Sequence, residues 1–347
     1  MLAAVLKEAH QIGLEEVPKP VLLNDSDVIL KVTATTICSS DVHFWEGHLP
    51  PSPPFIIGHE FAGIVEEAGN AVKTLKPGDR VAVPAYPFCG ICDNCREGLT
   101  GWCLNSALLG SGESFGNLPG GLAEFVRVPH ADSCFVKIPD EISDDQAIFV
   151  GDMLATGYFA VDNCSLNLGD TVAVFGAGPV GLCAVHIARL HSPSKIILVG
   201  RRSNRLQTGL KMGATHIIDA AEPDSAAQVM EITNGQGVNA AIEAVGLAET
   251  INTAAEVIKK GGTLSVVGFF PPGNIDFPMN TLLFKNATVK MGMTPQDNMR
   301  MLMGLLVDGK LDTSPLITHR MPFKEFEKAF TIFAEKQENV IKIILKP

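Results

Sequence analysis

The sequence contains no run of 18 apolar residues, so it offers no candidate for a membrane-spanning helix. Aromatic residues make up only 6% and charged residues 19%, while hydrophobic residues reach 46%, a mixture that builds globular cores rather than disordered chain. Positive charge is also scarce. The formal net charge of −11 argues against a nucleic-acid partner or an anionic membrane surface.

We also expect no targeting segment at the start of this sequence. The first ten residues, MLAAVLKEAH, have no basic start and no cleavage-type region, so we expect no signal peptide and a cytoplasmic protein. The cytosol keeps thiols reduced, so the eight cysteines need an explanation other than disulfides.

Four of these cysteines lie within 15 residues, in the pattern Cys89-x2-Cys92-x2-Cys95-x7-Cys103. Two CxxC steps and a short closing loop bring four thiolates together, which is typical of a structural zinc site closed to substrate. An iron–sulfur cluster is the weaker alternative, because one zinc ion satisfies such a loop without any redox role. We place this structural zinc lobe at residues 86–104.

The length of 347 residues favours two domains, and the pattern of expected strands and helices changes near residue 170. The first part has short apolar runs between Pro and Gly turns, which predicts a β-rich domain. After it, strands alternate with helices, which predicts a parallel sheet covered on both faces. The expected strands are Thr171–Phe175, Lys195–Val199, Ala214–Ile218, Ala240–Glu243 and Thr263–Val267. The expected helices are Val180–Leu190, Asn204–Met212 and Thr250–Lys259, and a last strand, Val340–Leu345, is expected to return to the first domain.

A dinucleotide motif opens the second domain. Gly176-Ala177-Gly178-Pro179-Val180-Gly181 reads GxGxxG and stands directly between an apolar strand and a helix, the context that distinguishes a true site from a chance match. Such glycines allow a tight turn and a close approach of the backbone, and the helix N-terminus then holds a pyrophosphate. The sequence therefore predicts a nucleotide-binding Rossmann domain.

The end of the next strand predicts which nucleotide binds. An NAD site usually places Asp or Glu about 20 residues after the motif, on the ribose 2′-hydroxyl. Here Gly200 takes that place, followed by Arg201, Arg202 and then Arg205. Guanidinium groups favour a 2′-phosphate, so NADP is the expected cofactor and NAD the alternative.

Three further residues become informative only together. Cys38, His59 and Asp152 each have an ordinary interpretation as a core thiol, a hydrogen-bonded histidine or a helix cap. However, Asp152 lies in the apolar stretch Val150-Gly151-Asp152-Met153-Leu154, where a lone carboxylate is costly without a partner.

The stretch Gly58-His59-Glu60-x2-Gly63-x5-Gly69-x2-Val72 resembles the zinc signature of the medium-chain alcohol dehydrogenases at every fixed position. The resemblance covers the whole chain and is closest to the bacterial NADP-dependent secondary alcohol dehydrogenases. It implies an α/β fold, with a GroES-like catalytic domain (1–153 and 295–347) and a Rossmann domain (154–294). The complete four-cysteine lobe is a departure, because those enzymes often lack it.

The resemblance also implies the catalytic zinc site. Cys38, His59 and Asp152 would bind the ion, and Glu60 would be an alternate fourth ligand. A catalytic zinc leaves a fourth position open and acts as a Lewis acid on the oxygen of an alcohol or carbonyl compound.

The remaining roles are also carried over from the family. Ser40 and His43 would relay a proton, Thr156 would pack against the nicotinamide, and Lys342 would reach the cofactor phosphates. A dimer or tetramer is expected. The implied activity is reversible hydride transfer between NADP and a small alcohol, ketone or aldehyde. The enzyme rivals are a formaldehyde dehydrogenase or aldehyde dismutase with tightly held cofactor, and a polyol or threonine dehydrogenase.

Overall fold

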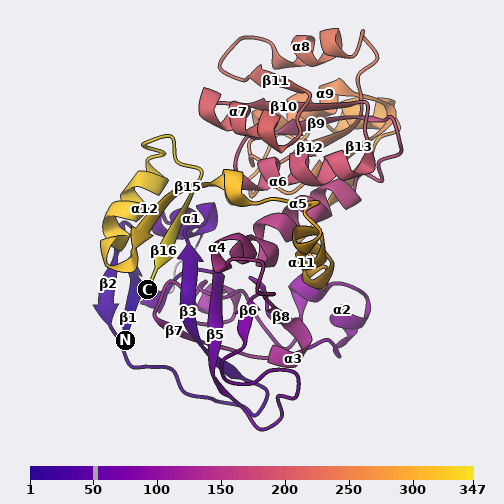
Figure 1. The fold of residues 1–347 in the computed structure, drawn as a ribbon. Helices are drawn as coiled ribbons and strands as arrows, with labels where there is room; N and C mark the ends of the chain where they lie inside the picture. The colour runs from indigo at the N-terminus through magenta and orange to yellow at the C-terminus, as the bar shows by residue number, and fades with distance from the viewer. Residues whose placement is uncertain (50–53) are drawn as a thin grey trace. The chain divides into compact units, whose positions relative to one another are not determined.

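The computed structural model describes residues 1–49 and 54–347 and divides the chain into two compact units (Figure 1). The first unit comprises Met1–Ala155 and Thr294–Pro347, and the second comprises Thr156–Met293. The boundaries expected from the sequence were 153/154 and 294/295. Helix α5 (Met153–Asp162) carries the chain from the first unit into the second.

The first unit is built on two sheets. The larger has the strand order β15, β16, β3, β5, β6, β8, with β7 also paired to β3. Its strands are Ile317–Pro322, Lys342–Lys346, Val28–Thr36, Glu60–Ala68, Arg80–Ala82, Val136–Lys137 and Phe125–Val128, in that order. The smaller sheet has the order β2 (Gln11–Glu16), β1 (Leu2–Glu8), β4 (Phe55–Ile56).

The end of the chain completes the larger sheet. Strand β16 pairs antiparallel with β3 and parallel with β15, so the yellow strand lies beside the indigo one in Figure 1. The predicted return of Val340–Leu345 to this unit is therefore confirmed. The helices of the unit are α1 (Ser39–Trp45), α2 (Asp93–Arg96), α3 (Ala131–Cys134), α4 (Asp144–Ala147), α11 (Met299–Val307) and α12 (Phe326–Ala334).

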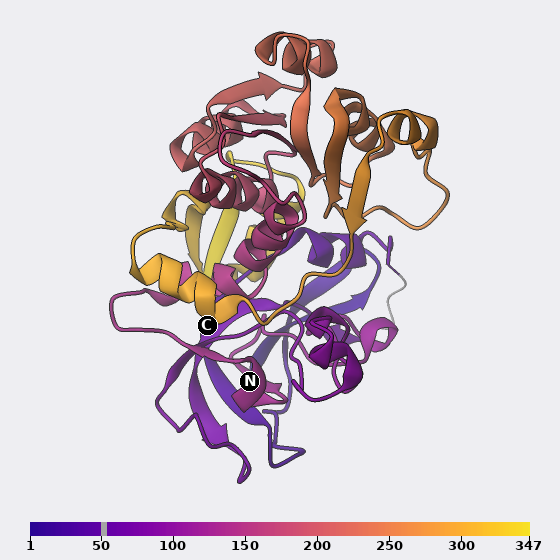
Figure 2. The same ribbon diagram turned by 90° about the vertical axis from the view of Figure 1, so that its right-hand side faces the viewer.

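The second unit is a six-stranded parallel sheet in the order β11, β10, β9, β12, β13, β14. Figure 2 shows these strands with helices packed against them. The strands are His216–Asp219, Lys195–Gly200, Thr171–Phe175, Val238–Glu243, Ile258–Val266 and Thr288–Met291, in the same order. The helices are α6 (Pro179–Ala188), α7 (Ser203–Met212), α8 (Ser225–Ile232), α9 (Ala248–Val257) and α10 (Met279–Phe284).

From β9 the chain builds the sheet first in one direction, through β10 and β11, and then in the other, through β12, β13 and β14. Strand β9 therefore lies between β10 and β12 at the point where the connections switch sides. Nucleotides bind at such a switch point, beyond the carboxyl ends of the strands. The apolar sequence TVAVF of β9 is buried after its first residue, as expected for a strand covered on both faces. The doubly wound sheet predicted from the alternation of strands and helices along the sequence is confirmed.

Several predicted boundaries differ from the observed ones, most of all where α9 meets β13. The helix expected over Thr250–Lys259 is α9, which ends at Val257, and β13 begins at the next residue. Ile258 is 1% exposed, packs in the core of this unit and pairs with Val238 of β12, so tertiary burial ends the helix there. Within the described residues no helix is long and apolar enough to cross a membrane.

Candidate active site

Cys38 stands at the junction of β3 and α1 and is buried. Its backbone N–H donates to Asp41 Oδ2 at 2.8 Å, and the Asp41 N–H donates to the Cys38 carbonyl at 3.2 Å. These reciprocal bonds satisfy groups left open at the start of a helix and fix the thiol at the first turn.

His59 and Glu60 stand where β5 begins, and both are almost fully buried. The preceding Gly58 has φ +99°, and a Cβ there would lie 2.8 Å from the backbone nitrogen of Leu122. Only glycine permits this turn and this close approach. Gly58 therefore allows the turn after which the His59 and Glu60 side chains are buried in the first unit.

Asp152 follows the short helix Ile148–Gly151 and completes the group. Its Oδ2 lies 3.4 Å from His59 Nε2 and 3.8 Å from Cys38 Sγ. Ligands of a tetrahedral zinc ion are separated by about 3.3 Å for N and O pairs and about 3.6 Å for S and O pairs. One donor atom from each of Cys38, His59, Glu60 and Asp152 lies within 4.8 Å of the others. The structure thus brings together all four residues predicted at the catalytic zinc, and the two distances from Asp152 fit the ion.

Asp41 supports this group from behind His59. His59 Nδ1 faces Asp41 Oδ1 at 3.9 Å, and neither buried atom has a hydrogen-bond partner. A carboxylate behind a histidine fixes the ring so that its other nitrogen, here Nε2, meets a metal. Sequence reasoning missed Asp41, although its position three residues after Cys38 matches a helix-capping pattern.

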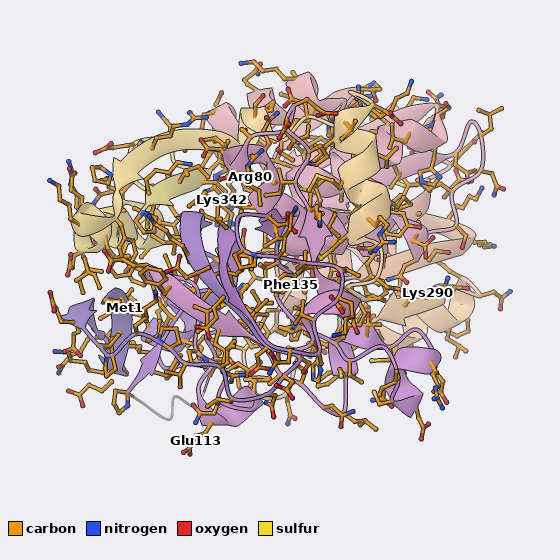
Figure 3. All side chains as sticks on the ribbon, turned by 60° about the horizontal axis from the view of Figure 1, so that its bottom comes forward. Met1, Arg80, Glu113, Phe135, Lys290 and Lys342 are labelled. Atoms are coloured by element: carbon orange, nitrogen blue, oxygen red, sulfur yellow. The ribbon has the colours of Figure 1, made fainter. Side chains whose placement is uncertain are left out.

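Lys342 lies on β16, fully buried, and is labelled in Figure 3. Its ammonium donates to Glu60 Oε1 at 2.6 Å and to the Ile37 carbonyl at 2.9 Å. The other oxygen of Glu60, Oε2, is buried without a partner. A contact of Lys342 with cofactor phosphates stays a prediction, and it would require the ammonium to leave this buried ion pair.

The charges in this region also favour a cation. Besides the single ammonium of Lys342, the groups that can carry charge here are mostly acidic. Burial, then the charge of Glu60, raises the pKa of the Cys38 thiol. Burial likewise raises the pKa values of Asp41 and Glu60. A divalent cation offsets such buried negative charge and holds a coordinated thiol in its deprotonated form.

Tyr86 is a further residue near this group that sequence reasoning missed. It is half-buried, and desolvation together with the charges of Asp152 and Cys38 raises its pKa. The phenol therefore stays protonated at neutral pH.

The two predicted relay residues lie on helix α1. Ser40 Oγ is 3.3 Å from His59 Nε2, and His43 follows one turn later, so both occupy the same side of the helix. Burial is the main influence that lowers the pKa of His43, which keeps its imidazole neutral at pH 7.

The four-cysteine lobe forms a separate cluster. Cys89, Cys92, Cys95 and Cys103 bring their sulfur atoms within 4.8 Å of one another. Cys92 Sγ and Cys103 Sγ are 4.0 Å apart, where a zinc tetrathiolate requires about 3.8 Å.

Local donors make these sulfurs suitable ligands. The backbone N–H of Cys92 and the Asn105 amide both donate to Cys89 Sγ. Burial opposes ionisation of Cys89, but donors that include the Ile91 N–H outweigh it and lower its pKa to about 6. The eight cysteines all lie in the described part of the chain and form no disulfide, and the three outside both clusters (Cys134, Cys164 and Cys183) are buried.

In the second unit, the three motif glycines have different roles. Gly176 has φ +115°, which makes the tight turn, and a Cβ on Gly181 would lie 1.8 Å from the Gly176 carbonyl oxygen, so helix and loop pack closely. A Cβ on Gly178 would meet nothing within 4 Å, which leaves open space beside the loop. Pro179 and Val180 begin α6 directly behind it. Open space at a helix N-terminus fits a dinucleotide pyrophosphate.

The predicted arginines follow the end of β10. A Cβ on Gly200 would lie 2.5 Å from the Cβ of Ala177, so the strand end lies against the glycine loop and excludes a carboxylate side chain. Arg201 and Arg202 are exposed and Arg205 is half-buried. Desolvation, followed by the charge of Arg202, lowers the pKa of Arg205 to about 10. These positive groups gather at the start of α7.

Arg202 also has φ +75°, a conformation that costs energy for any residue with a side chain.

Thr156 is half-buried on α5. The catalytic cluster therefore belongs to the first unit, and Thr156, the glycine loop and the arginines belong to the second.

Comparisons with known proteins agree with this chemistry. Residues 24–140 match the alcohol dehydrogenase GroES-like domain, and residues 179–308 match the zinc-binding dehydrogenase family. An alcohol dehydrogenase of Cupriavidus necator is 33% identical over all of this chain and 99% of its own length. The NADP-dependent isopropanol dehydrogenase of Thermoanaerobacter brockii is 36% identical, covering 96% of each chain. The solved alcohol dehydrogenase TADH from Thermus sp. ATN1 superposes with a TM-score of 0.94, at 34% identity, over 100% of this chain and 99% of that one.

Proposed function

This chain belongs to the zinc-binding alcohol dehydrogenases, and we propose that it uses NADP(H) to interconvert small secondary alcohols and their ketones. The choice of NADP(H) rests on the residues at and just after the end of β10. Gly200 leaves no room for the carboxylate that an NAD site uses, and three arginines stand next to it. Guanidinium groups bind a 2′-phosphate through charge-assisted hydrogen bonds.

Two further observations support this assignment. Arg202 keeps a strained backbone at the start of α7, as expected where a side chain is held in place for binding. The relative from Thermoanaerobacter brockii is NADP-dependent and acts on isopropanol, a small secondary alcohol. On the same family resemblance we propose a cytoplasmic homodimer or homotetramer.

The first unit supplies the groups for the chemistry. Cys38, His59 and Asp152 would hold the catalytic zinc, with Glu60 as alternate ligand, and the cysteine lobe would hold the structural one. A bound zinc ion supplies a Lewis acid that lowers the pKa of an alcohol and polarises a carbonyl.

The protein's own part is to orient these ligands and to move the proton. Ser40 Oγ lies beside the metal-facing nitrogen of His59, and a hydroxyl accepts one proton while it donates another. His43, neutral at pH 7, accepts a proton further along α1. The pair would carry the alcohol proton away from the buried ligands, and the route runs backwards when a ketone is reduced.

The coenzyme assignment predicts a selective effect of removing the exposed arginines. We expect the double variant Arg201→Ala/Arg202→Ala to lower kcat/KM for NADPH by about 10- to 100-fold, because hydrogen bonds to a charged group contribute about 1.5–3 kcal/mol. The value for NADH should stay unchanged. Steady-state kinetics with both coenzymes measures this.

Lys211→Ala is the matched control, because it removes an exposed positive charge from the last turn of the same helix. It should leave both coenzymes unaffected. An equal loss for NADPH and NADH in the arginine variant would mean that the arginines bind a part common to both, and the 2′-phosphate assignment would be wrong.

A further inference from the structure

The turn that follows α1 folds three potential metal ligands together, away from the two clusters already described. Helix α1 ends at Trp45, and Gly47 follows with φ +75°. The Gly47 N–H donates to the Phe44 carbonyl (3.1 Å), and the His48 N–H donates to the His43 carbonyl (3.0 Å). This pair of reverse bonds is typical of a helix that ends at glycine. It turns the chain back, so that His48 comes to lie beside His43, with Glu46 between them in sequence.

The three side chains converge on one point. His43 Nδ1 and His48 Nδ1 are 3.3 Å apart. Glu46 Oε2 lies 3.1 Å from His48 Nδ1 and 3.7 Å from His43 Nδ1. Nitrogen and oxygen ligands bound at about 2.0–2.1 Å to a tetrahedral zinc ion are separated by about 3.3 Å. The triangle of donors thus has the size of one face of a zinc coordination tetrahedron.

The chemical state of the ligands also suits a cation. Burial is the first cause that lowers the pKa of His43, and the neighbouring His48 and Lys336 lower it further against the charge of Glu46. A neutral imidazole is the form that binds a metal. Two imidazoles and one carboxylate form a ligand set for zinc and similar transition-metal ions, not for magnesium or calcium.

The cluster is partly open to solvent. The side chains of His43, Glu46 and His48 are 28%, 36% and 46% exposed. An ion can therefore enter from solution and keep water in its remaining position, as three-ligand zinc sites do.

We propose that His43, Glu46 and His48 form a third divalent-cation site, specific for Zn²⁺-like ions, whose occupation inhibits the enzyme. Binding follows from the geometry of these three residues alone. The inhibition rests on the proposed function, because it requires His43 to accept the proton that leaves the alcohol. A cation on Nδ1 blocks that nitrogen and repels a proton from the rest of the ring, so the relay stops.

The test uses the enzyme with both of its own metal clusters filled. The dialysed holoenzyme is titrated with ZnCl₂ by isothermal calorimetry, and alcohol oxidation is followed at the same free zinc concentrations. We expect one further equivalent of zinc per chain, with activity falling in parallel with its binding.

Two variants each remove one donor of the site and leave His43 itself in place. His48→Gln and Glu46→Gln should lower the affinity for the third ion by about tenfold or more, and the inhibition of each variant is measured relative to its own activity without added zinc. Inhibition should move to higher zinc concentration by the same factor. His319→Gln is the control, because His319 pairs with Glu338 at 3.4 Å but no third donor joins them in the described part of the chain. It should behave like the natural chain.

The outcomes separate the two claims. No third equivalent, or an unchanged third equivalent in His48→Gln, would overturn the site. A third equivalent that is lost in both variants but leaves wild-type activity unaffected would overturn the inhibition. A chain that binds the third ion and oxidises no alcohol would contradict the proposed function and leave the metal site standing.

Discussion

Replacing His59 with asparagine should remove one zinc ion per chain and lower kcat/KM for alcohol oxidation by about a thousandfold. His59 Nε2 faces Asp152 and Ser40 at 3.4 and 3.3 Å, so its loss opens the cluster at its centre. The estimate follows because a Lewis acid contributes several kcal/mol to the transition state and each 1.36 kcal/mol is about tenfold in rate. Metal content by mass spectrometry and steady-state kinetics measure both quantities.

Two further variants test whether the loss is local. Asp41→Asn keeps the helix cap but weakens the support behind His59, so we expect a smaller effect of about 10- to 100-fold on zinc affinity or activity. Cys134→Ala removes a buried thiol of the same unit that belongs to neither cluster, and it should retain both zinc ions. A His59→Asn enzyme that kept both metal ions and full activity would contradict the proposed ligand set.

Replacing Lys342 with methionine should destabilise the protein by about 3–5 kcal/mol, because it leaves the buried Glu60 carboxylate without its ion-pair partner. The two side chains are 1% and 0% exposed and 2.6 Å apart, so water cannot replace the lost ammonium. A change of this size lowers the melting temperature by on the order of 10 °C in a domain of this length. Scanning calorimetry of the zinc-loaded protein measures the shift.

The same pair provides its own control. The double variant Lys342→Met/Glu60→Gln removes both charges and should recover most of the lost stability. Lys7→Met breaks the exposed pair of Lys7 with Glu15, where the effect should be below about 1 kcal/mol. If Lys342→Met were no more harmful than Lys7→Met, the ion pair would contribute nothing to the fold.

Much of the fold could be predicted because its signals are local. Strand β9, the glycine loop and α6 follow one another within a few residues, and their apolar and glycine patterns need no distant partner. The end of α9 could not be predicted in this way. Val257 and Ile258 are both apolar, and only the pairing of Ile258 with β12 shows that the helix has stopped.

The catalytic cluster is a harder case, because its members come from three separate parts of the chain. The resemblance to the alcohol dehydrogenases predicted Cys38, His59, Glu60 and Asp152 together, and the structure places their donor atoms within 4.8 Å. Spacing along the sequence alone gave no reason to join Asp152 to the other three. The comparisons confirm the family, while the individual roles of Ser40, His43 and Thr156 stay predictions.

The sequence around Lys342 indicates a buried ion pair, but the family resemblance suggested a contact with the cofactor phosphates instead. It stands between Ile341 and Ile343 in an apolar strand, and a charge in such a position needs a buried partner. Its partner, Glu60, is far away in sequence, and only the pairing of β16 with β3 and of β3 with β5 brings the two together. Asp41 was overlooked for a different reason, since a helix cap and a support for a metal ligand look the same in sequence.

The most direct test of the account is coenzyme oxidation with short ketones and aldehydes, followed by absorbance with NADPH and with NADH, in the presence and absence of phenanthroline. We predict oxidation that is faster with NADPH, occurs with ketones and is abolished by the chelator. Preference for NADH would overturn the arginine assignment and leave the zinc chemistry intact. Activity that persisted at full rate in phenanthroline, or conversion of formaldehyde to methanol and formate with no net coenzyme oxidation, would contradict the proposed function.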